Sequence, residues 1–396
     1  MSLIGLISKS FIILHINKNR SVMKKVVVLG AGSVGRAIAI DLVKSYEITV
    51  VDENHSNLER LSEFTKIKTI LTDLNETDEI QNVVKGFDLV IGALPGYMGF
   101  KALKQSILAG VDIVDVSLFP EDPFELNQLA IERNVTVVVD AGVSPGMGNV
   151  ILGYHNAKMD ISSYKCYGGG LPFKREWPYE YKAVFSPMDV LEEYTRPARY
   201  VLNGEIVVRE ALSEAEINHF EPVGSLEAWN TDGLRTLIKT MKIPNMIEKT
   251  LRYPGTIKYI KVLKETGFFS SDPLLVNGKQ IRPIDVTTKL LFPVWELKKG
   301  EEDYTMLRVI IKGKEKGIDK KITYNLFDRF EKKTNTTSMA RSTGYTCSAI
   351  ANLLLNNKIE DKGICPPEYI GKNKENFEYI IHHLTERGVQ YNVNEE

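Results

Sequence analysis

Apolar runs that are rich in β-branched residues alternate with helix-like segments in the first part of the chain, from Lys25 to about Gly142. The runs are short and continuous, as in KKVVVLG, which is typical of parallel strands that are buried on both faces. The intervening segments carry apolar residues at helical spacing, as in SVGRAIAIDLVKS. Six such runs separated by helices predict an α/β fold with a doubly wound parallel sheet, the Rossmann arrangement.

The pattern changes after the stretch DAGVSPGMGN. Up to about residue 337, strand-like runs are punctuated by glycine and proline, with some helix interspersed, which predicts a second α+β domain on a mixed or antiparallel sheet. Two amphipathic helices, TGYTCSAIANLLLNN and KENFEYIIHHLTERG, are expected to pack back on the first domain. The predicted units are a Rossmann domain over 23–150, a substrate and dimerisation domain over 151–340, and C-terminal helices over 341–396.

Residues 1–22 precede a second methionine, Met23, after which a strand begins at once. Their apolar runs are broken by Lys9 and His15, are too short to span a membrane, and lack a basic n-region and a small-residue cleavage site. We interpret this segment as a non-functional extension.

Composition narrows the class of protein. A length of 396 residues favours two domains, and 43% apolar with 26% charged residues describes a globular protein without a membrane segment. The net charge of −1 and the absence of a long basic run argue against nucleic-acid binding. Cys166, Cys347 and Cys365 are far apart and form no metal motif, and the adjacent His382 and His383 carry little weight as a metal site. We therefore expect buried thiols, no metal and a cytoplasmic setting.

The first predicted strand leads into a glycine-rich turn with the spacing G-x-G-x-x-G. Gly30 permits the tight turn, Gly32 lets the backbone approach a pyrophosphate, and Gly35 lets the helix lie close to the strand. Ser33 and Val34 open that helix, whose free N–H groups and dipole favour phosphate. Strand, turn and helix together predict a dinucleotide site.

Three later strand ends are expected to contact the same ligand, because ligands of such sheets lie outside the carboxyl ends of the strands. Asp52 ends the second strand, where a carboxylate bonds a ribose 2′-hydroxyl, and Glu53 adds negative charge that would repel a 2′-phosphate. No arginine follows immediately, so NAD is favoured over NADP. The third strand is expected to close with Asp73 and Leu74, and the fourth with Ala93, Leu94 and Pro95.

Motifs along the whole chain from Met23 onward resemble the saccharopine dehydrogenase family, in particular its lysine 6-dehydrogenase-like branch. Besides GAGSVG and DAGVSPGMGN, the motifs are VDVS, GGGLP, YKAVFSP, EEYTRPARYVLNGE, GSLEAWNTDGLRTL, TLRYPG and STGYT. The stretches EEYTRPAR and NTDGLRTL point to the lysine dehydrogenase-like branch.

The resemblance implies NAD(P)-linked oxidation at a carbon–nitrogen bond. For the lysine branch, the ε-carbon of L-lysine gives hydride to the nicotinamide, and water releases ammonia from the resulting iminium to leave a semialdehyde that cyclises. Such chemistry needs a proton acceptor near the amine and a cation for the substrate carboxylate.

Asp115 and Asp140 lie at or just after strand carboxyl ends and are the candidates for proton transfer, with turn or N-cap carboxylates as the alternative. Arg252 matches a substrate-binding position of the saccharopine branch and is the expected carboxylate anchor. Further substrate contacts are expected from Arg196, Arg199, Thr231, Ser186 and Ser117. No general base is assigned with confidence.

Two other functions remain open. A saccharopine or carboxynorspermidine-type dehydrogenase would need two arginine anchors, and a regulatory protein would bind NAD without turnover. We expect a small amino acid as substrate and a homodimer formed through the second domain.

Overall fold

The first domain is built on a parallel sheet in the order β17-β6-β5-β4-β1-β2-β3, which confirms the predicted Rossmann arrangement. The computed structural model describes residues 23–64, 66–298 and 300–396, so the predicted extension over residues 1–22 lies outside the described residues. The strands are β1 (Lys25–Leu29), β2 (Glu47–Asp52), β3 (Ile67–Leu71), β4 (Leu89–Gly92), β5 (Ile113–Asp115), β6 (Thr136–Val138) and β17 (Gly363–Ile364).

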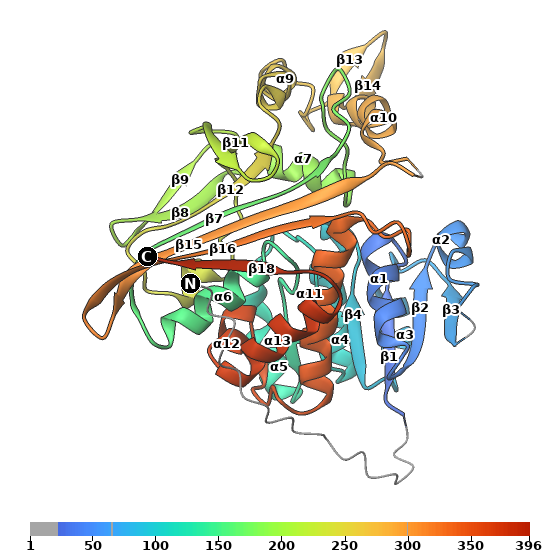
Figure 1. Cartoon of the computed structure of the whole chain (residues 1–396). Helices are drawn as coiled ribbons and strands as arrows, with labels where there is room; N and C mark the ends of the chain where they lie inside the picture. The colour runs from blue at the N-terminus through green and yellow to red at the C-terminus, as the bar shows by residue number, and fades with distance from the viewer. Residues whose placement is uncertain (1–22, 65, 299) are drawn as a thin grey trace.

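Helices cover both faces of this sheet (Figure 1). They are α1 (Ser33–Leu42), α2 (His55–Glu59), α3 (Thr77–Val84), α4 (Gly96–Ala109), the 3-10 helix η1 (Pro123–Leu126), α5 (Asn127–Glu132) and α6 (Met147–Asn156). Val26 and Val28 of β1 pack into one apolar cluster, whereas Val27 and Leu29 pack into another on the opposite face. Burial on both faces explains why the strand reads as an uninterrupted apolar run.

The second domain is built on a larger mixed sheet in the order β10-β11-β12-β7-β15-β16-β18, with β8 joined to β12 and β9 joined to β8. Its strands are β7 (Asp160–Pro172), β8 (Ala198–Leu202), β9 (Glu205–Arg209), β10 (Glu216–Phe220), β11 (Gly224–Asn230), β12 (Met246–Arg252), β15 (Asp303–Glu315), β16 (Ile318–Arg329) and β18 (Tyr391–Glu395). The central strand β7 pairs in parallel with β12 and antiparallel with β15. The predicted α+β character is confirmed.

The remaining elements of this domain are α7 (Pro187–Thr195), α8 (Leu237–Thr240), α9 (Thr256–Glu265), α10 (Pro283–Trp295) and the hairpin β13 (Leu274–Val276) with β14 (Lys279–Ile281). Of these, α9, α10 and the hairpin form a small lobe on the side of the second sheet away from the first domain (Figure 1). Within the described residues, we find no helix with the length and apolar character needed to cross a bilayer.

The C-terminal segment joins both sheets, which the sequence reading missed. It contains α11 (Ser338–Leu355), α12 (Pro367–Gly371) and α13 (Lys374–Glu386), but it also supplies β17 to the first sheet and β18 to the second. The predicted boundary at residue 340 falls inside α11, which lies beside α1 (Figure 1). Thr343 and Gly344 lie within this helix and do not open it. A Cβ on Gly344 would lie 3.3 Å from Ala37, so the glycine permits close packing of the two helices.

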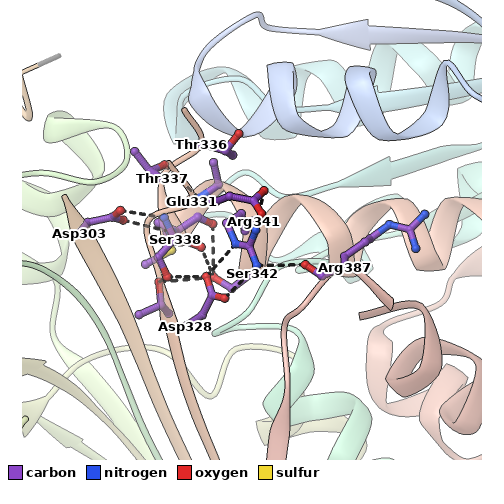
Figure 2. Close-up of polar contacts among 12 residues, drawn as sticks. Asp303, Asp328, Glu331, Thr336, Thr337, Ser338, Arg341, Ser342 and Arg387 are labelled. Carbon is purple, nitrogen blue, oxygen red and sulfur yellow. Dashed lines mark hydrogen bonds and ion pairs between the residues drawn. The ribbon is translucent and has the colours of Figure 1, made fainter. Parts of the chain in front are cut away.

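A buried polar cluster fixes the start of α11 to the second sheet (Figure 2). Both carboxylate oxygens of Asp303 accept hydrogen bonds, at 2.7 Å from the N–H of Ser338 and 3.1 Å from that of Met339. Asp328 accepts from the Ser338 hydroxyl at 2.8 Å and pairs with Arg341 at 3.2 Å. The first turn of a helix has free N–H groups, so Asp303 caps α11 and binds it to β15, while Asp328 binds its side chains to β16.

A second cluster fixes α11 and α13 to α1. The Asp41 carboxylate of α1 accepts from the Ser348 hydroxyl at 2.7 Å and from Arg387 Nε at 2.8 Å, and it lies 3.3 Å from His383. Burial opposes ionisation of Asp41, but the hydrogen bonds and the Arg387 charge outweigh it and hold its pKa well below the ordinary value.

Replacing Asp41 with Asn should lower the free energy of unfolding by about 3 kcal/mol at neutral pH, because it leaves Arg387 without its buried partner. The ionised carboxylate is favoured in the folded state, so its contribution is present above about pH 4 and is lost as the pH falls further. Urea unfolding of both proteins should therefore show a stability difference that shrinks in acid. Asp285→Asn, at an exposed pair with Arg282, is the matched control. A difference independent of pH would contradict the assignment.

Candidate active site

A cleft of about 1840 Å³ runs between the two domains. Its walls come from the glycine-rich turn after β1, the ends of β2 and β4, and the second sheet at β7, β12 and β15. The segment from Phe330 to Thr337, which precedes α11, also lines it. The Asp303 and Asp328 cluster therefore supports one wall of the cleft.

The glycine-rich turn has the geometry that a dinucleotide needs. Gly30 has φ +100°, and a Cβ there would lie 2.4 Å from the Ala93 carbonyl oxygen. A Cβ on Gly35 would lie 2.0 Å from the Gly30 carbonyl oxygen, so the missing side chain lets α1 start against the turn. A Cβ on Gly32 would meet no atom within 4 Å, and no side chain caps α1. The space over Gly32 and the N–H groups of the first turn are thus open to a phosphate.

Asp52 lies where a ribose would be bound. One oxygen accepts from the Ala31 N–H at 2.6 Å and the other from the Asn54 N–H at 2.7 Å. An ionised carboxylate has about four acceptor positions, so it retains capacity for a hydroxyl group. The neighbouring Glu53 is exposed and lines the same end of the cleft.

Two arginines at this end were not predicted. Arg36 follows Gly35 in α1, and Arg60 follows α2, and both line the cleft. Arg36 also donates to the Asn335 carbonyl oxygen at 3.2 Å and so joins the first domain to the segment before α11. For NADP, an arginine directly after Asp52 and Glu53 was expected, whereas the fold brings Arg36 from α1 and Arg60 from the end of α2.

Every residue predicted to contact the cofactor lines the cleft. They are Gly30, Gly32, Ser33, Val34, Gly35, Asp52, Glu53, Asp73, Leu74, Ala93, Leu94 and Pro95. The third strand ends at Leu71 rather than Asp73, so Asp73 and Leu74 lie in the loop beyond it. Pro95 directly precedes α4, which begins at Gly96.

The N-terminus of α4 is bonded to the second domain. The N–H of Gly96 donates to the carboxylate of Asp189, on α7, at 3.1 Å and 3.3 Å. Burial raises the pKa of Asp189 to about 7 even though this hydrogen bond lowers it. Ser186, one of the predicted substrate contacts, caps α7 and lines the cleft.

Arg252 lies in the cleft but already has protein partners. Its side chain is almost fully buried, and it pairs with Glu193 at 3.1 Å. It also donates to the hydroxyls of Tyr194 and Tyr181 and to the Leu251 carbonyl oxygen. A substrate carboxylate would have to compete with Glu193 for this guanidinium, and the predicted role of Arg252 as carboxylate anchor stays a prediction.

The other two predicted arginines lie in different surroundings. Arg196 lines the cleft and is paired with Glu192 of α7. Arg199 does not line the cleft. Two nitrogens of its guanidinium group each donate to the carboxylate of Asp232 at 2.8 Å, near the surface. The predicted contact between Arg199 and substrate therefore stays a prediction, in which Arg199 would act beside the cleft-lining Asp232.

Asp115 and Asp140 do not line the cleft, which corrects their predicted catalytic role. Asp115 is fully buried against Gly92 and accepts from the N–H and hydroxyl of Ser117. Burial raises its pKa to about 8. Asp140 is paired with Arg235 at 2.6 Å, and both residues have positive φ, at 54° and 44°. These carboxyl groups support the turns beneath the site. Ser117, which binds Asp115, does line the cleft.

Glu248 is a cleft residue that the sequence reading missed. It lies on β12, where the two-residue repeat of a strand places Glu248, Thr250 and Arg252 on one face, and all three line the cleft. The hydroxyl of Thr231, a predicted substrate contact, lies 3.0 Å from the hydroxyl of Thr250. A glutamate in the strand MIEKTLR, at an even spacing from Arg252, was the signal that could have identified it.

The carboxyl group of Glu248 is buried with one oxygen unpaired. Oε1 accepts from the Ser144 hydroxyl at 2.8 Å, and Oε2 has no hydrogen-bond partner among the described residues. A Cβ on Gly233 would lie 0.9 Å from Oε2, so that glycine leaves room for the carboxyl group. Burial raises the pKa of Glu248 to about 8, although the Ser144 hydrogen bond lowers it.

Fold and cleft together define a dinucleotide-binding protein with a separate domain closing over the cofactor site. Residues 26–138 match the Saccharopine dehydrogenase NADP binding domain, and residues 142–389 match the Saccharopine dehydrogenase C-terminal domain. The chain belongs to the saccharopine dehydrogenase family, and its cofactor is a nicotinamide dinucleotide.

Curated relatives agree with this assignment. The mitochondrial alpha-aminoadipic semialdehyde synthase of Rattus norvegicus is 25% identical over 94% of this chain and 48% of its own length. A saccharopine dehydrogenase (NADP(+), L-glutamate-forming) of Pyricularia oryzae is 27% identical over 63% of this chain and 59% of its own length. The chain thus spans about half the length of the mitochondrial relatives it matches.

Solved structures share the fold. The apo saccharopine dehydrogenase (L-Glu forming) of Saccharomyces cerevisiae has a TM-score of 0.75 at 20% identity, over 94% of this chain and all of that chain. The homospermidine synthase of Legionella pneumophila in complex with NAD has a TM-score of 0.65 at 11% identity, over 94% of this chain and 91% of that chain.

Replacing Gly32 with Ala should weaken dinucleotide binding by about tenfold or more, because the methyl group would occupy the space left for the pyrophosphate. Thermal stability should be unchanged, since the Cβ meets no protein atom. Gly35→Ala is the contrasting variant and should lose both stability and binding, because its Cβ collides with the Gly30 carbonyl. Fluorescence titration with NADH and NADPH and thermal unfolding measure the two effects. Unaltered binding by Gly32→Ala would contradict the assignment.

Proposed function

We propose that the protein catalyses the NAD-dependent oxidative deamination of an amino acid side-chain amine, with L-lysine oxidised at its ε-carbon. Hydride passes from that carbon to the nicotinamide, and water hydrolyses the resulting iminium to ammonia and a semialdehyde. The semialdehyde then closes on its own α-amine to a cyclic imine. The proposal goes beyond the family assignment in both substrate and cofactor.

The charge balance of the substrate end carries the proposal. Its two cleft-lining arginines, Arg252 and Arg196, are already paired with Glu193 and Glu192. Glu248 remains there as a buried carboxyl group without a cation. A buried carboxylate is stabilised by an opposite charge, so this end suits a substrate that brings an ammonium group. Saccharopine brings more carboxylates, and the cleft-lining cations left for them are the exposed Lys289, Lys298 and Lys333, at the rim rather than beside Glu248.

NAD is proposed because of the acidic end of β2. The carboxylates of Asp52 and Glu53 favour a ribose with a free 2′-hydroxyl and disfavour a 2′-phosphate. Arg36 and Arg60 are the groups that would accommodate a 2′-phosphate if the protein accepts NADP as well.

Saccharopine oxidation is the second candidate. It is supported by the names of the curated relatives and by the presence of two arginines in the cleft, which its carboxylates could bind if Glu192 and Glu193 moved aside. A non-catalytic NAD sensor is a weaker alternative, because a cleft with substrate-domain groups extends well beyond the nucleotide end.

Absorbance at 340 nm, recorded with NAD and each amine in turn, tests the substrate. We expect NADH to form with L-lysine and not with saccharopine. Formation with saccharopine alone would replace the first candidate by the second. Measurable NAD binding without turnover of any amine would favour the sensor.

Replacing Asp52 with Ser should raise KM for NAD about tenfold and improve the use of NADP, because a charge-assisted hydrogen bond to the ribose is lost and a repulsive charge is removed. The ratio of kcat/KM for the two cofactors measures the change. Glu59→Gln, at an exposed position of α2 outside the cleft, is the control for a simple loss of charge. An unchanged cofactor ratio in Asp52→Ser would contradict the role of Asp52.

A further inference from the structure

We propose that Glu248 accepts the proton of the substrate ammonium group before hydride transfer, and that the hydroxyl of Ser144 positions its carboxylate for this step. The inference rests on the proposed function, because it concerns an amine substrate in this cleft. It assigns the acid–base group that the sequence reading left open.

The carboxyl group of Glu248 is buried in the wall of the cleft and has a free hydrogen-bonding position. Glu248 is only 7% exposed, lines the cleft from β12, and has an oxygen without a hydrogen-bond partner in the described part of the chain. An unpaired buried polar atom is destabilising, so it marks a position where a ligand can supply the missing hydrogen bond. An ammonium N–H is a suitable donor for Oε2.

The other buried carboxyl groups near the cleft already have a hydrogen-bond or ion-pair partner within the protein. Asp189 accepts from Gly96, Glu193 is paired with Arg252, and Asp232 is paired with Arg199. Asp115 and Asp140 do not reach the cleft. Among the described residues that line the cleft, Glu248 therefore combines burial with an unpaired oxygen.

The proton balance of the step is as follows. The ammonium N–H bond breaks, its electron pair stays on nitrogen, and the proton moves to Glu248. The neutral amine then has the lone pair that forms the C=N bond as hydride leaves the ε-carbon, so the substrate is oxidised by two electrons and the nicotinamide is reduced. Water hydrolyses the iminium to the aldehyde and ammonium, and Glu248 gives its proton to solvent.

Several charged groups set the pH at which the step operates. Burial and the negative charges of Glu193 and Asp232 raise the pKa of Glu248, whereas Ser144 and Arg235 lower it, and together they hold it at about 8. Cys166 and Tyr164 of β7 also interact with this carboxyl group, and burial raises the pKa of both of them. Below the pKa of Glu248, its carboxyl group is protonated and cannot accept a proton. The acidic limb of kcat/KM should therefore rise as the pH increases through about 8.

The glutamine variant tests the role of Glu248. Glu248→Gln should lower kcat/KM by about 100-fold or more and lose the limb near pH 8, since general base catalysis contributes that much. NADH binding should be unchanged, which shows that the variant is folded. Glu216→Gln, on β10 of the same sheet and outside the cleft, should keep the wild-type rate and profile. A Glu248→Gln protein with wild-type rate or with the limb retained would overturn the proposal.

The alanine variant at Ser144 separates positioning from a merely structural role. Ser144→Ala removes a hydrogen bond that favours the ionised form, so the limb should move to higher pH while activity above it is largely retained. A limb that stays in place would overturn the role of Ser144.

The two proposals fail differently. Wild-type activity with saccharopine but not with L-lysine contradicts the proposed substrate, and the same variants then test Glu248 on the secondary amine of saccharopine. Wild-type activity with L-lysine and an unaffected Glu248→Gln contradicts only the role of Glu248. Absence of turnover with every amine contradicts both.

Discussion

The chemistry of the cleft depends on how the second sheet is held over the carboxyl ends of the parallel strands. Helix α11 has the central part in this, because one of its ends is bound to β15 and β16 by Asp303 and Asp328 while its side packs on α1. The Asp41 cluster then fixes α13 to the same helix pair. These contacts are buried and charge-assisted, so they are among the stronger polar interactions available to a protein.

That arrangement gives the cleft two ends with different electrostatics. At one end, the open first turn of α1 offers unpaired N–H groups to phosphate, and Asp52 offers a carboxylate to a hydroxyl group. At the other end, arginines are neutralised by neighbouring glutamates, and Glu248 is left without a cation. A cleft that binds an anion at one end and holds a buried carboxyl group without a paired cation at the other is suited to a nicotinamide cofactor opposite a protonated amine.

The local part of this description could be predicted from sequence. The parallel sheet, the turn at Gly30 and Gly35, and the acid at Asp52 follow from short patterns that have a direct physical meaning. Strand β17 could not be predicted, because it has two residues and is separated from its neighbour β6 by more than two hundred positions. Likewise, α11 was expected to start at Thr343, because its capping contact from Asp303 comes from a distant strand.

The candidate site shows the same division. Asp115 and Asp140 stand at strand ends, which is the right edge of the sheet, but sequence does not tell whether such a carboxyl faces the cleft or lies beneath it. Ser117 and Arg235 settle this by binding them under the site. Glu248 was overlooked because it lies within a strand of the second domain, and only the packing of β12 against Ser144 and Gly233 gives its carboxyl group an exceptional environment.

The central claim is that hydride leaves the ε-carbon of an amine held in this cleft, and isotope transfer tests it most directly. The purified protein is incubated with NAD and with L-lysine deuterated at the ε-carbon or at the α-carbon, and the reduced cofactor is analysed by mass spectrometry. The account predicts deuterium in the reduced nicotinamide from the ε-labelled substrate and none from the α-labelled one. Deuterium from the α-carbon, or no reduced cofactor from either substrate, would contradict it.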